Sequence, residues 1–178
     1  MRPPITREDI RRTEDMESRH HARIHATCAL RERSKENWQA WSKAAEAWQA
    51  QVYPTDVLWT DEFRAALKAS SRDAIEQAIL YLEVDPWYFR SGYLKDRLIR
   101  GLKQAVLREK DRDRLRNVIW NVVMGRNRTE FRRYCGLAAL IVTEDFRRML
   151  ESRFPESDAA SRGKLGHLIQ FLDKHAPR

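Results

Sequence analysis

The sequence contains few of the residues that interrupt regular secondary structure. Its 178 residues include six glycines and six prolines, and neither type occurs from residue 5 to 53 or from 55 to 85. A domain built from strands needs a turn about every 8 to 12 residues, and such turns usually contain glycine or proline. The long stretches without either residue therefore exclude a strand-rich fold. They predict an all-α protein, in agreement with the abundance of Ala, Leu, Arg and Glu, which are good helix formers.

Cysteines and long hydrophobic runs are also scarce. Cys28 and Cys135 are the only cysteines, and two cysteines without a CxxC partner cannot form a disulfide framework. No apolar run approaches the roughly 20 residues that span a bilayer, and residues 1–8 lack the apolar stretch of a secretion signal. We therefore expect a soluble protein of the reducing cytoplasm that has no contact with membranes.

The N-terminal segment predicts one long polar helix. Thr6 and Asp9 have the spacing of a capping box, and the helix is expected to run from there to about Arg33. Few of its residues are apolar, so little surface is available to offset the entropy of ordering it. Residues 1–34 are therefore interpreted as an arm, and residues 35–178 as an all-helical domain.

A stripe of large apolar residues marks the next predicted helix, over residues 35–51. Its members follow one helix face at spacings of three and four residues, and they are Trp38, Trp41, Ala45 and Trp48. We expect this stripe to lie in the core. The alternative is a groove for a partner, because tryptophan is common at interface hot spots.

Short helices are expected along the rest of the chain. Each follows a polar residue that can accept hydrogen bonds from a first turn, and these residues are Thr60, Ser71, Ser91, Asp111, Thr129 and Thr143, with a last helix after Pro155. Asp85-Pro86 and Gly125 are the predicted stops, Gly125 with a left-handed backbone. The uncharged segment 134–142 is expected to lie between other helices. The pattern predicts eight or nine short antiparallel helices in a stack or a compact bundle.

An internal similarity favours the stack. Residues 78–98 align with residues 120–140 at an offset of 42, which pairs Phe89-Arg90 with Phe131-Arg132 and Leu98 with Leu140. This offset lies within the repeat length of about 40 to 47 residues that HEAT and armadillo units have. Over residues 55–175 the chain thus resembles bacterial HEAT-like helical-repeat proteins in architecture. That resemblance implies a scaffold that binds other molecules rather than one that catalyses a reaction.

Positive charge is concentrated in one part of the chain. The whole sequence has 34 Lys and Arg against 26 Asp and Glu, a formal charge of +8. Residues 87–133 alone contain 14 cationic and 5 acidic side chains, an excess of nine. Such a surface attracts polyanions, and arginine offers a planar pair of donors to phosphate or carboxylate. The alternative is a solvated face on which acids such as Asp111 and Asp113 neutralise some of the arginines.

The candidate partner-binding residues follow from this charge and from the aromatic segment 85–93. Pro86 sets a turn there, and the four aromatic residues near it either form a joint between two helix pairs or stack on a ligand. Trp87 and Tyr88 are expected to be the more exposed of the four. The candidate set is Trp87, Tyr88, Arg90, Arg97, Arg100, Lys103, Arg126, Arg128, Arg132 and Arg133.

Metal binding and catalysis have little support in the sequence. His21, His25 and Cys28 lie on one helix face, but two helical turns separate the first from the last, so we predict no metal site and no cofactor. No phosphate-binding loop or nucleophile elbow is present. A DNA glycosylase with HEAT-like architecture is conceivable, and its candidate residues would be Trp59, Trp87 and Trp120 with Asp56, Asp61 or Asp85.

Three functions remain open from the sequence. The first is a non-enzymatic module that binds an acidic protein surface with residues 87–133, as an adaptor, a complex subunit or an immunity-type protein would. The second is a DNA- or RNA-binding module that places the same arginines on phosphates. The third is the glycosylase. We predict binding of a protein partner, and the sequence does not predict an oligomeric state.

Overall fold

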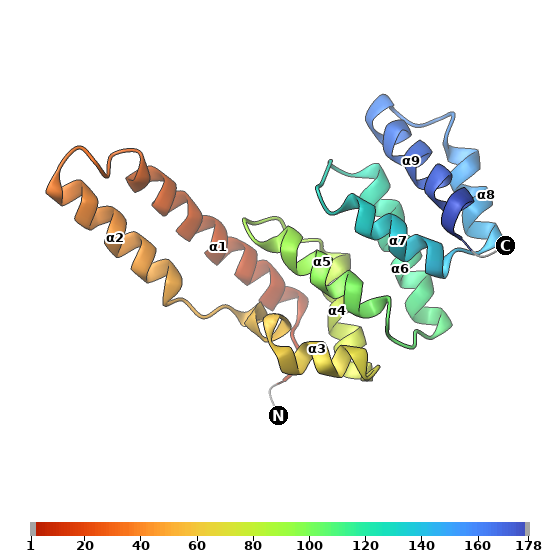
Figure 1. The fold of residues 1–178 in the computed structure, drawn as a ribbon, viewed down its shortest axis with the longest axis horizontal. Coiled ribbons are helices and arrows are strands. Elements are labelled where there is room, and N and C mark those ends of the chain that lie inside the picture. The colour runs from red at the N-terminus through yellow and green to blue at the C-terminus, as the bar shows by residue number, and fades with distance from the viewer. Residues whose placement is uncertain (1–2, 177–178) are drawn as a thin grey trace.

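The computed structural model describes residues 3–176, and in that range it is entirely helical (Figure 1). The all-α prediction is confirmed. None of the helices in residues 3–176 has both the length and the apolar character required to cross a bilayer. The elements in chain order are α1 (Arg7–Cys28), α2 (Lys35–Gln49), the 3-10 helix η1 (Pro54–Trp59), α3 (Asp61–Lys68), α4 (Arg72–Val84), α5 (Ser91–Leu102), α6 (Glu109–Met124), α7 (Phe131–Ile141), α8 (Glu144–Arg153) and α9 (Ala159–His175).

Side-chain caps begin several of these helices at the predicted residues. The Thr6 hydroxyl accepts a hydrogen bond from the Asp9 amide at 3.1 Å, and the Asp9 carboxylate accepts one from the Thr6 amide at 2.9 Å. This is the predicted capping box. Helices α2, α3 and α8 have a simpler cap, in which one side chain accepts a hydrogen bond from the amide three residues further on. The capping residues are Ser34, Thr60 and Thr143, so these helix starts depend on local sequence.

Several predicted helix boundaries differ from expectation. Helix α1 ends at Cys28 rather than near Arg33, and Ser91, Asp111 and Thr129 do not cap α5, α6 and α7. Asp85 ends α4 in the left-handed region, with φ of 51°, as a stop before Pro86 requires. Gly125 ends α6 with φ of −92° and ψ of −162°, so the prediction of a left-handed Gly125 is wrong. The chain leaves α6 in an extended direction, and the Gly125 carbonyl accepts a hydrogen bond from the Lys164 ammonium group of α9.

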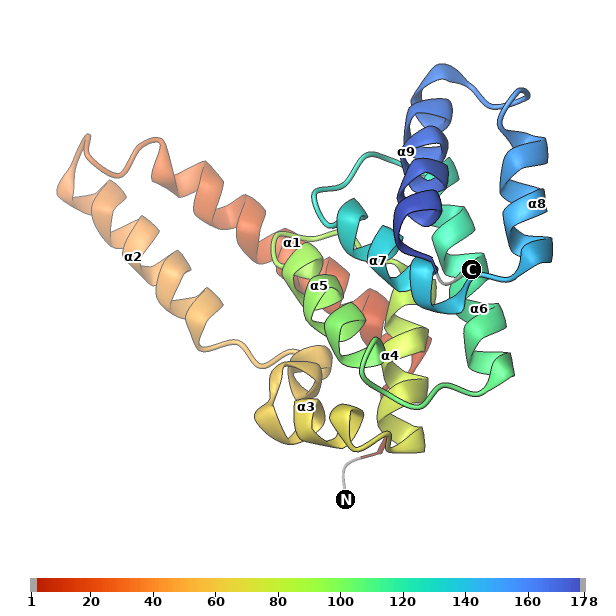
Figure 2. The same cartoon turned by 45° about the vertical axis from the view of Figure 1, so that its right-hand side comes forward.

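The helices after η1 form a stack of antiparallel pairs (Figures 1 and 2). Helix α6 packs on α4, α7 packs on α5, and α9 packs on both α6 and α7. Their facing sides form one continuous core, which includes Ile79, Leu98, Ile119, Leu137 and Leu168. Helix α7, which is uncharged from Tyr134 onward, contacts α5, α6 and α9, so the predicted position of this segment between other helices is confirmed.

The α4–α5 and α6–α7 pairs correspond in the sequence at a spacing of about 40 residues rather than 42. Helix α6 begins 37 and ends 40 residues after α4, and α7 begins 40 and ends 39 residues after α5. At an offset of 42, Leu98 would correspond to Leu140, but Leu98 is buried and Leu140 is 51% exposed. The predicted pairing of these two leucines is therefore wrong, and a HEAT-like repeat stays a prediction.

Helices α1 and α2 form an antiparallel hairpin that extends from one end of the stack (Figure 1). Only Ala44 of α2 is fully buried, and Trp38 is 53% exposed. Trp48 donates its indole N–H to the buried carboxylate of Glu17 at 2.9 Å, and Trp41 lies under the guanidinium of Arg31. The prediction of a core stripe is therefore wrong. These tryptophans pack on α1, whose polar face supplies a hydrogen-bond acceptor.

Candidate functional site

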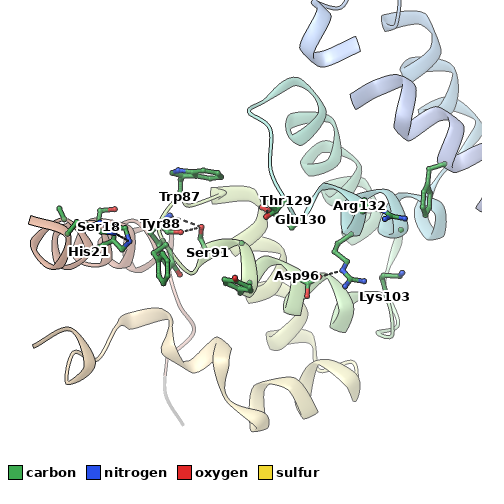
Figure 3. A pocket seen from close by; sticks show the side chains of 18 residues that line it. Ser18, His21, Trp87, Tyr88, Ser91, Asp96, Lys103, Thr129, Glu130 and Arg132 are labelled. Carbon is green, nitrogen blue, oxygen red and sulfur yellow. Dashed lines mark hydrogen bonds and ion pairs between the residues drawn. The ribbon is translucent and has the colours of Figure 1, made fainter. Parts of the chain in front are cut away.

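A groove of about 1320 Å³ runs across the stack beside the hairpin (Figure 3). One wall is the second half of α1, with Ser18, His21 and His25. The floor is formed by the turn between α4 and α5 and by the exposed sides of α5 and α7, and Phe171 of α9 closes the far end. Segments that are distant in the sequence therefore meet in one concave surface.

Aromatic rings line the end of the groove next to α1, here called the aromatic end: His21, Trp87, Phe89 and Tyr93. Phe89 stacks on His21 with ring centroids 4.9 Å apart and meets Trp48 edge-on at 6.0 Å. Trp87, Phe89 and Tyr93 are 48%, 57% and 73% exposed. The rings thus offer apolar surface to a ligand, since the fold leaves so much of each uncovered.

Tyr88 does not belong to this exposed set. Its hydroxyl lies 2.7 Å from the hydroxyl of Tyr81, and only 9% of the residue is exposed. Ser91 fixes its backbone by accepting from the Tyr88 amide and donating to the Tyr88 carbonyl. The expectation that Trp87 and Tyr88 are the more exposed of the four aromatic residues is therefore wrong, because Phe89 and Tyr93 are more exposed than both. Tyr88 is part of the joint between helix pairs.

Cationic side chains line the other end, here called the basic end: Lys103, Arg132 and Arg133. Within residues 3–176, Lys103 and Arg132 have no acidic partner, and Arg133 shares Asp96 with Arg100 at 2.5 Å each. Arg100 and Arg133 remain 60% and 54% exposed. One acid thus holds two arginines, so the basic end keeps an excess of positive charge.

Glycine shapes the floor of the basic end. A Cβ atom at Gly136 would lie 3.1 Å from the Lys103 Nζ, so the lysine crosses α7 at the one position where no side chain projects. Lys103 follows the last residue of α5, and Gly136 lies in the middle of α7. The ammonium group is therefore brought beside Arg132 and Arg133 by close packing of two helices.

A cluster of four charges, of which the Asp85 side chain is partly exposed and the other three side chains are buried, lies beneath the aromatic end and is here called the buried charge cluster: Asp85, Lys95, Arg128 and Glu130. Asp85 accepts two hydrogen bonds from Arg128, at 2.6 and 2.9 Å, and one oxygen lies 2.7 Å from the Lys95 ammonium. The Lys95 ammonium also donates to the Pro86 carbonyl at 2.7 Å. Glu130 Oε1 lies 4.0 Å from Lys95 and 3.9 Å from Arg128 and accepts no hydrogen bond from the described residues.

The environment of this cluster shifts its proton affinities. Burial lowers the pKa of Lys95 below its ordinary value, and the facing Asp85 offsets only part of that effect. Burial alone would raise the pKa of Asp85, but the hydrogen bonds and charges of Arg128 and Lys95 outweigh it and lower that pKa. Asp85 therefore stays ionised, and the two turns that carry these residues are tied together by charge.

The cationic side chains of residues 87–133 fall into two groups: those that form ion pairs with acids of the chain, and those that form none with the described residues. Seven of the 14 cationic residues in 87–133 form ion pairs within the chain: Lys95, Arg97, Arg100, Arg114, Arg116, Arg128 and Arg133. Arg128 is only 2% exposed, so its predicted role at a partner surface is wrong. Arg97 donates to the Thr60 carbonyl and to Asp61, away from the groove. The prediction of one continuous basic ridge is therefore corrected to a local basic end.

Two further candidate arginines lie against aromatic rings rather than against acidic side chains. The Arg126 guanidinium lies 4.2 Å from the ring centre of Trp87, and that of Arg90 lies 4.8 Å from the ring centre of Trp59. Both arginines are exposed. Arg126 therefore covers one face of Trp87 beside the groove, while Arg90 points to the neighbouring α3 side.

Sequence reasoning missed the wall that α1 contributes and three residues of the groove floor. His21 and His25 come from a helix that was interpreted as an arm, and no local pattern places that helix beside α5. Phe89, Tyr93 and Asp96 also line the groove. The helical spacing of Tyr93 and Asp96 was a usable signal, because both lie opposite the buried Leu98 face of α5.

The metal and glycosylase candidates do not converge on a site. His21 and His25 bring their Nε2 atoms within 3.1 Å, but Cys28 Sγ accepts from Arg31, and residues 3–176 contain no group of three metal-binding side chains. Among the glycosylase candidates, Trp87 lines the groove, whereas Trp59 and Asp61 line a separate cavity against α3. Asp85 is held in the buried charge cluster.

Comparison with protein-family models, curated proteins and solved structures finds no match to this chain. The fold and the groove define a helical-stack protein with a concave surface that is aromatic at one end and basic at the other. Function is therefore argued from the chemistry of that surface.

Proposed function

We propose that this protein is a non-enzymatic binding module that receives an acidic segment of a partner protein in the groove. The observation that carries the proposal is the meeting of unneutralised cations and exposed aromatic rings in one concave surface. Lys103 and Arg132 supply charge that no residue of 3–176 neutralises, and Phe89 and Tyr93 supply apolar area. Interfaces with proteins are typically enriched in aromatic residues and arginine at their centres.

The distribution of charge favours a protein segment over a nucleic acid. A nucleic acid presents a phosphate at every nucleotide and is held by cations that follow its backbone. Here Asp96 and Glu130 line the groove between its two ends, and half of the cations in 87–133 are already paired. A phosphate backbone crossing the groove would meet these acids, whereas a protein segment can place acidic residues at the basic end only.

We also propose that the groove is the concave surface of a helical-repeat scaffold. The 40-residue correspondence between the α4–α5 and α6–α7 pairs supports a HEAT-like helical repeat, in which inner helices of successive pairs build an extended concave surface. Helices α5 and α7 supply the floor of the groove, as the inner helices of such a stack would. Scaffolds of this kind use that surface to bind a partner.

The test compares two anionic ligands of equal length on the whole protein. A fluorescently labelled peptide that carries glutamates at one end and uncharged residues elsewhere, and labelled oligothymidylate, are titrated with the protein at low salt, and binding is followed by anisotropy. We expect the peptide to bind and Lys103→Glu with Arg132→Glu to weaken its binding at least tenfold. The matched control is Lys110→Glu with Arg112→Glu on α6, because both residues are exposed, lie outside the groove and change the net charge equally.

Two results would overturn the proposed function. One is binding of oligothymidylate with a steep salt dependence and no binding of the glutamate-containing peptide, because that pattern is typical of phosphate neutralisation. The other is equal weakening by the groove and control variants, which would assign the attraction to net charge rather than to the groove.

A further inference from the structure

The two ends of the groove differ in chemistry and lie at a fixed separation. We propose that the groove recognises an extended segment with two features: an aromatic or large aliphatic anchor, and carboxylates placed about four to five residues from it. This inference rests on the proposed function and specifies the partner's motif.

The separation follows from α5, which connects the two ends. Tyr93 lies in its first turn and Lys103 directly follows its last residue, so ten residues separate them along nearly straight helix. A rise of about 1.5 Å per residue gives about 15 Å between the two positions. An extended chain advances about 3.3 Å per residue, so about four to five residues cover that distance. Figure 3 shows the same arrangement, with Trp87 near one end and Arg132 and Lys103 at the other.

The aromatic end is built to receive an anchor. Phe89 is fixed between His21 and Trp48, which hold its ring while leaving 57% of the residue exposed. Tyr93 lines the same groove and is 73% exposed. A ring or a branched aliphatic side chain packed against these residues would cover apolar surface, and about 25 cal/mol is gained for each Å² of apolar surface removed from water.

The middle of the groove determines where carboxylates are excluded. Asp96 is already shared by two arginines, and Glu130 belongs to the buried charge cluster with an oxygen that accepts no hydrogen bond within the described residues. A ligand carboxylate beside Glu130 would meet like charge at short range, which disfavours it. The acids of the partner are therefore confined to the basic end, and this confinement makes the motif bipartite rather than uniformly acidic.

The basic end can bind carboxylates because the hydrogen-bond donors of Lys103 and Arg132 have no acidic partner within residues 3–176. The two groups also differ in shape. Arg132 offers a planar fork, and Lys103 offers a compact ammonium group beside it. Arg133 uses one side of its guanidinium for Asp96 and is 54% exposed. Two neighbouring carboxylates can thus be received together, whereas a single one would leave cations uncompensated.

The experiment selects random peptides, displayed on phage, against the whole protein. Enriched sequences are expected to place Asp or Glu pairs four to five positions from Phe, Tyr, Trp, Leu or Ile. Synthetic peptides with the same anchor and the same acid pair, separated by one, four, five or nine residues, are then measured by anisotropy. Peptides with separations of four and five should bind at least tenfold more tightly than those with one or nine.

Two variants of the protein test which end of the groove recognises the anchor and which end recognises the carboxylates. Tyr93→Ala should remove the preference for an anchor and keep that for acids, and Lys103→Glu should do the reverse. Val106→Ala is the matched control for Tyr93, because Val106 is 76% exposed and lies outside the groove. A Tyr93 variant with a native helical spectrum and unchanged affinity would overturn the assignment of the anchor site.

The outcomes separate this inference from the proposed function. Acidic peptides that bind equally at every separation would overturn the bipartite motif and leave the acidic partner in place. Enrichment of basic peptides, or of none, would overturn both.

Discussion

Replacing Asp85 by asparagine tests whether the buried charge cluster holds the floor of the groove. Asparagine has nearly the same shape and tolerates the left-handed backbone that Asp85 adopts, so the substitution removes charge and little else. Lys95 and Arg128 would keep their positions, at 0% and 2% side-chain exposure, with Glu130 as the only acid near them in the described part of the chain. Two buried cations would then face one carboxylate at about 4 Å.

The expected loss is large because the side chains of Lys95 and Arg128 are almost fully buried. Removing one partner from a buried ion pair costs about 3 to 5 kcal/mol. Domains have a free energy of unfolding of about 5 to 15 kcal/mol, so this is a major fraction of the total. For a chain of this size each kcal/mol corresponds to about 2 to 4 °C in Tm, and we expect Asp85→Asn to lower Tm by about 6 to 20 °C.

Urea denaturation at two pH values measures the effect and identifies its cause. The pKa of Lys95 is already lowered in the folded protein, and it should fall further without Asp85. Between the folded and unfolded pKa values of a lysine the unfolded chain binds more protons, so stability rises with pH there. The deficit of Asp85→Asn should therefore be smaller at pH 10 than at pH 7.

The control for this prediction is an exposed ion pair. Asp61 is 77% exposed and pairs with Arg64 and Arg97, so Asp61→Asn should cost no more than about 1 kcal/mol. A loss for Asp85→Asn as small as that for Asp61→Asn, or one identical at pH 7 and pH 10, would refute the argument.

Packing and thiol chemistry provide two further tests. A Cβ at Gly101 would overlap Leu67 Cδ2 in the core, so Gly101→Ala should cost about 1 to 3 kcal/mol, whereas Gly163→Ala meets no atom within 4 Å and should gain about 0.5 to 1 kcal/mol. Urea midpoints that shift in the same direction for both variants would contradict this. Burial raises the pKa of Cys135 to about 11, so a thiol reagent at pH 8 should label the partly exposed Cys28 much faster in the folded protein. Mass spectrometry gives the two rates, and equal rates would show that Cys135 is accessible.

The sequence predicted those parts of the fold that depend on local chemistry. Scarce glycine and proline predicted helices, and Thr6, Ser34 and Thr60 cap them through hydrogen bonds to residues three positions away. The prediction for Gly125 was wrong because glycine permits a left-handed backbone without requiring one, and here the extended Gly125 accepts a hydrogen bond from Lys164, 39 residues further on. The tryptophan stripe failed for a related reason. Periodicity identifies an apolar face, but it does not say whether that face meets the core or only a neighbouring helix.

The sequence predicted several residues of the candidate site but not how they are arranged in space. Lys103, Arg132 and Trp87 were named and line the groove, whereas Arg128 is buried by Asp85, 43 residues earlier. Charge counting cannot distinguish these cases, because pairing depends on which helices become neighbours. Phe89 shows the same limit, because the position of its ring depends on contacts with His21 and Trp48, which are distant in the sequence.

The hairpin of α1 and α2 gives the groove a mechanical property. The first half of α1 packs against α4 and η1, and its second half forms a wall of the groove and carries α2. A rigid rod anchored at one end acts as a lever, so a small tilt of α1 that widens the groove would displace the distal loop near Ser34 by a larger distance. Occupancy of the groove should therefore be readable as a change in the distance between that loop and α9.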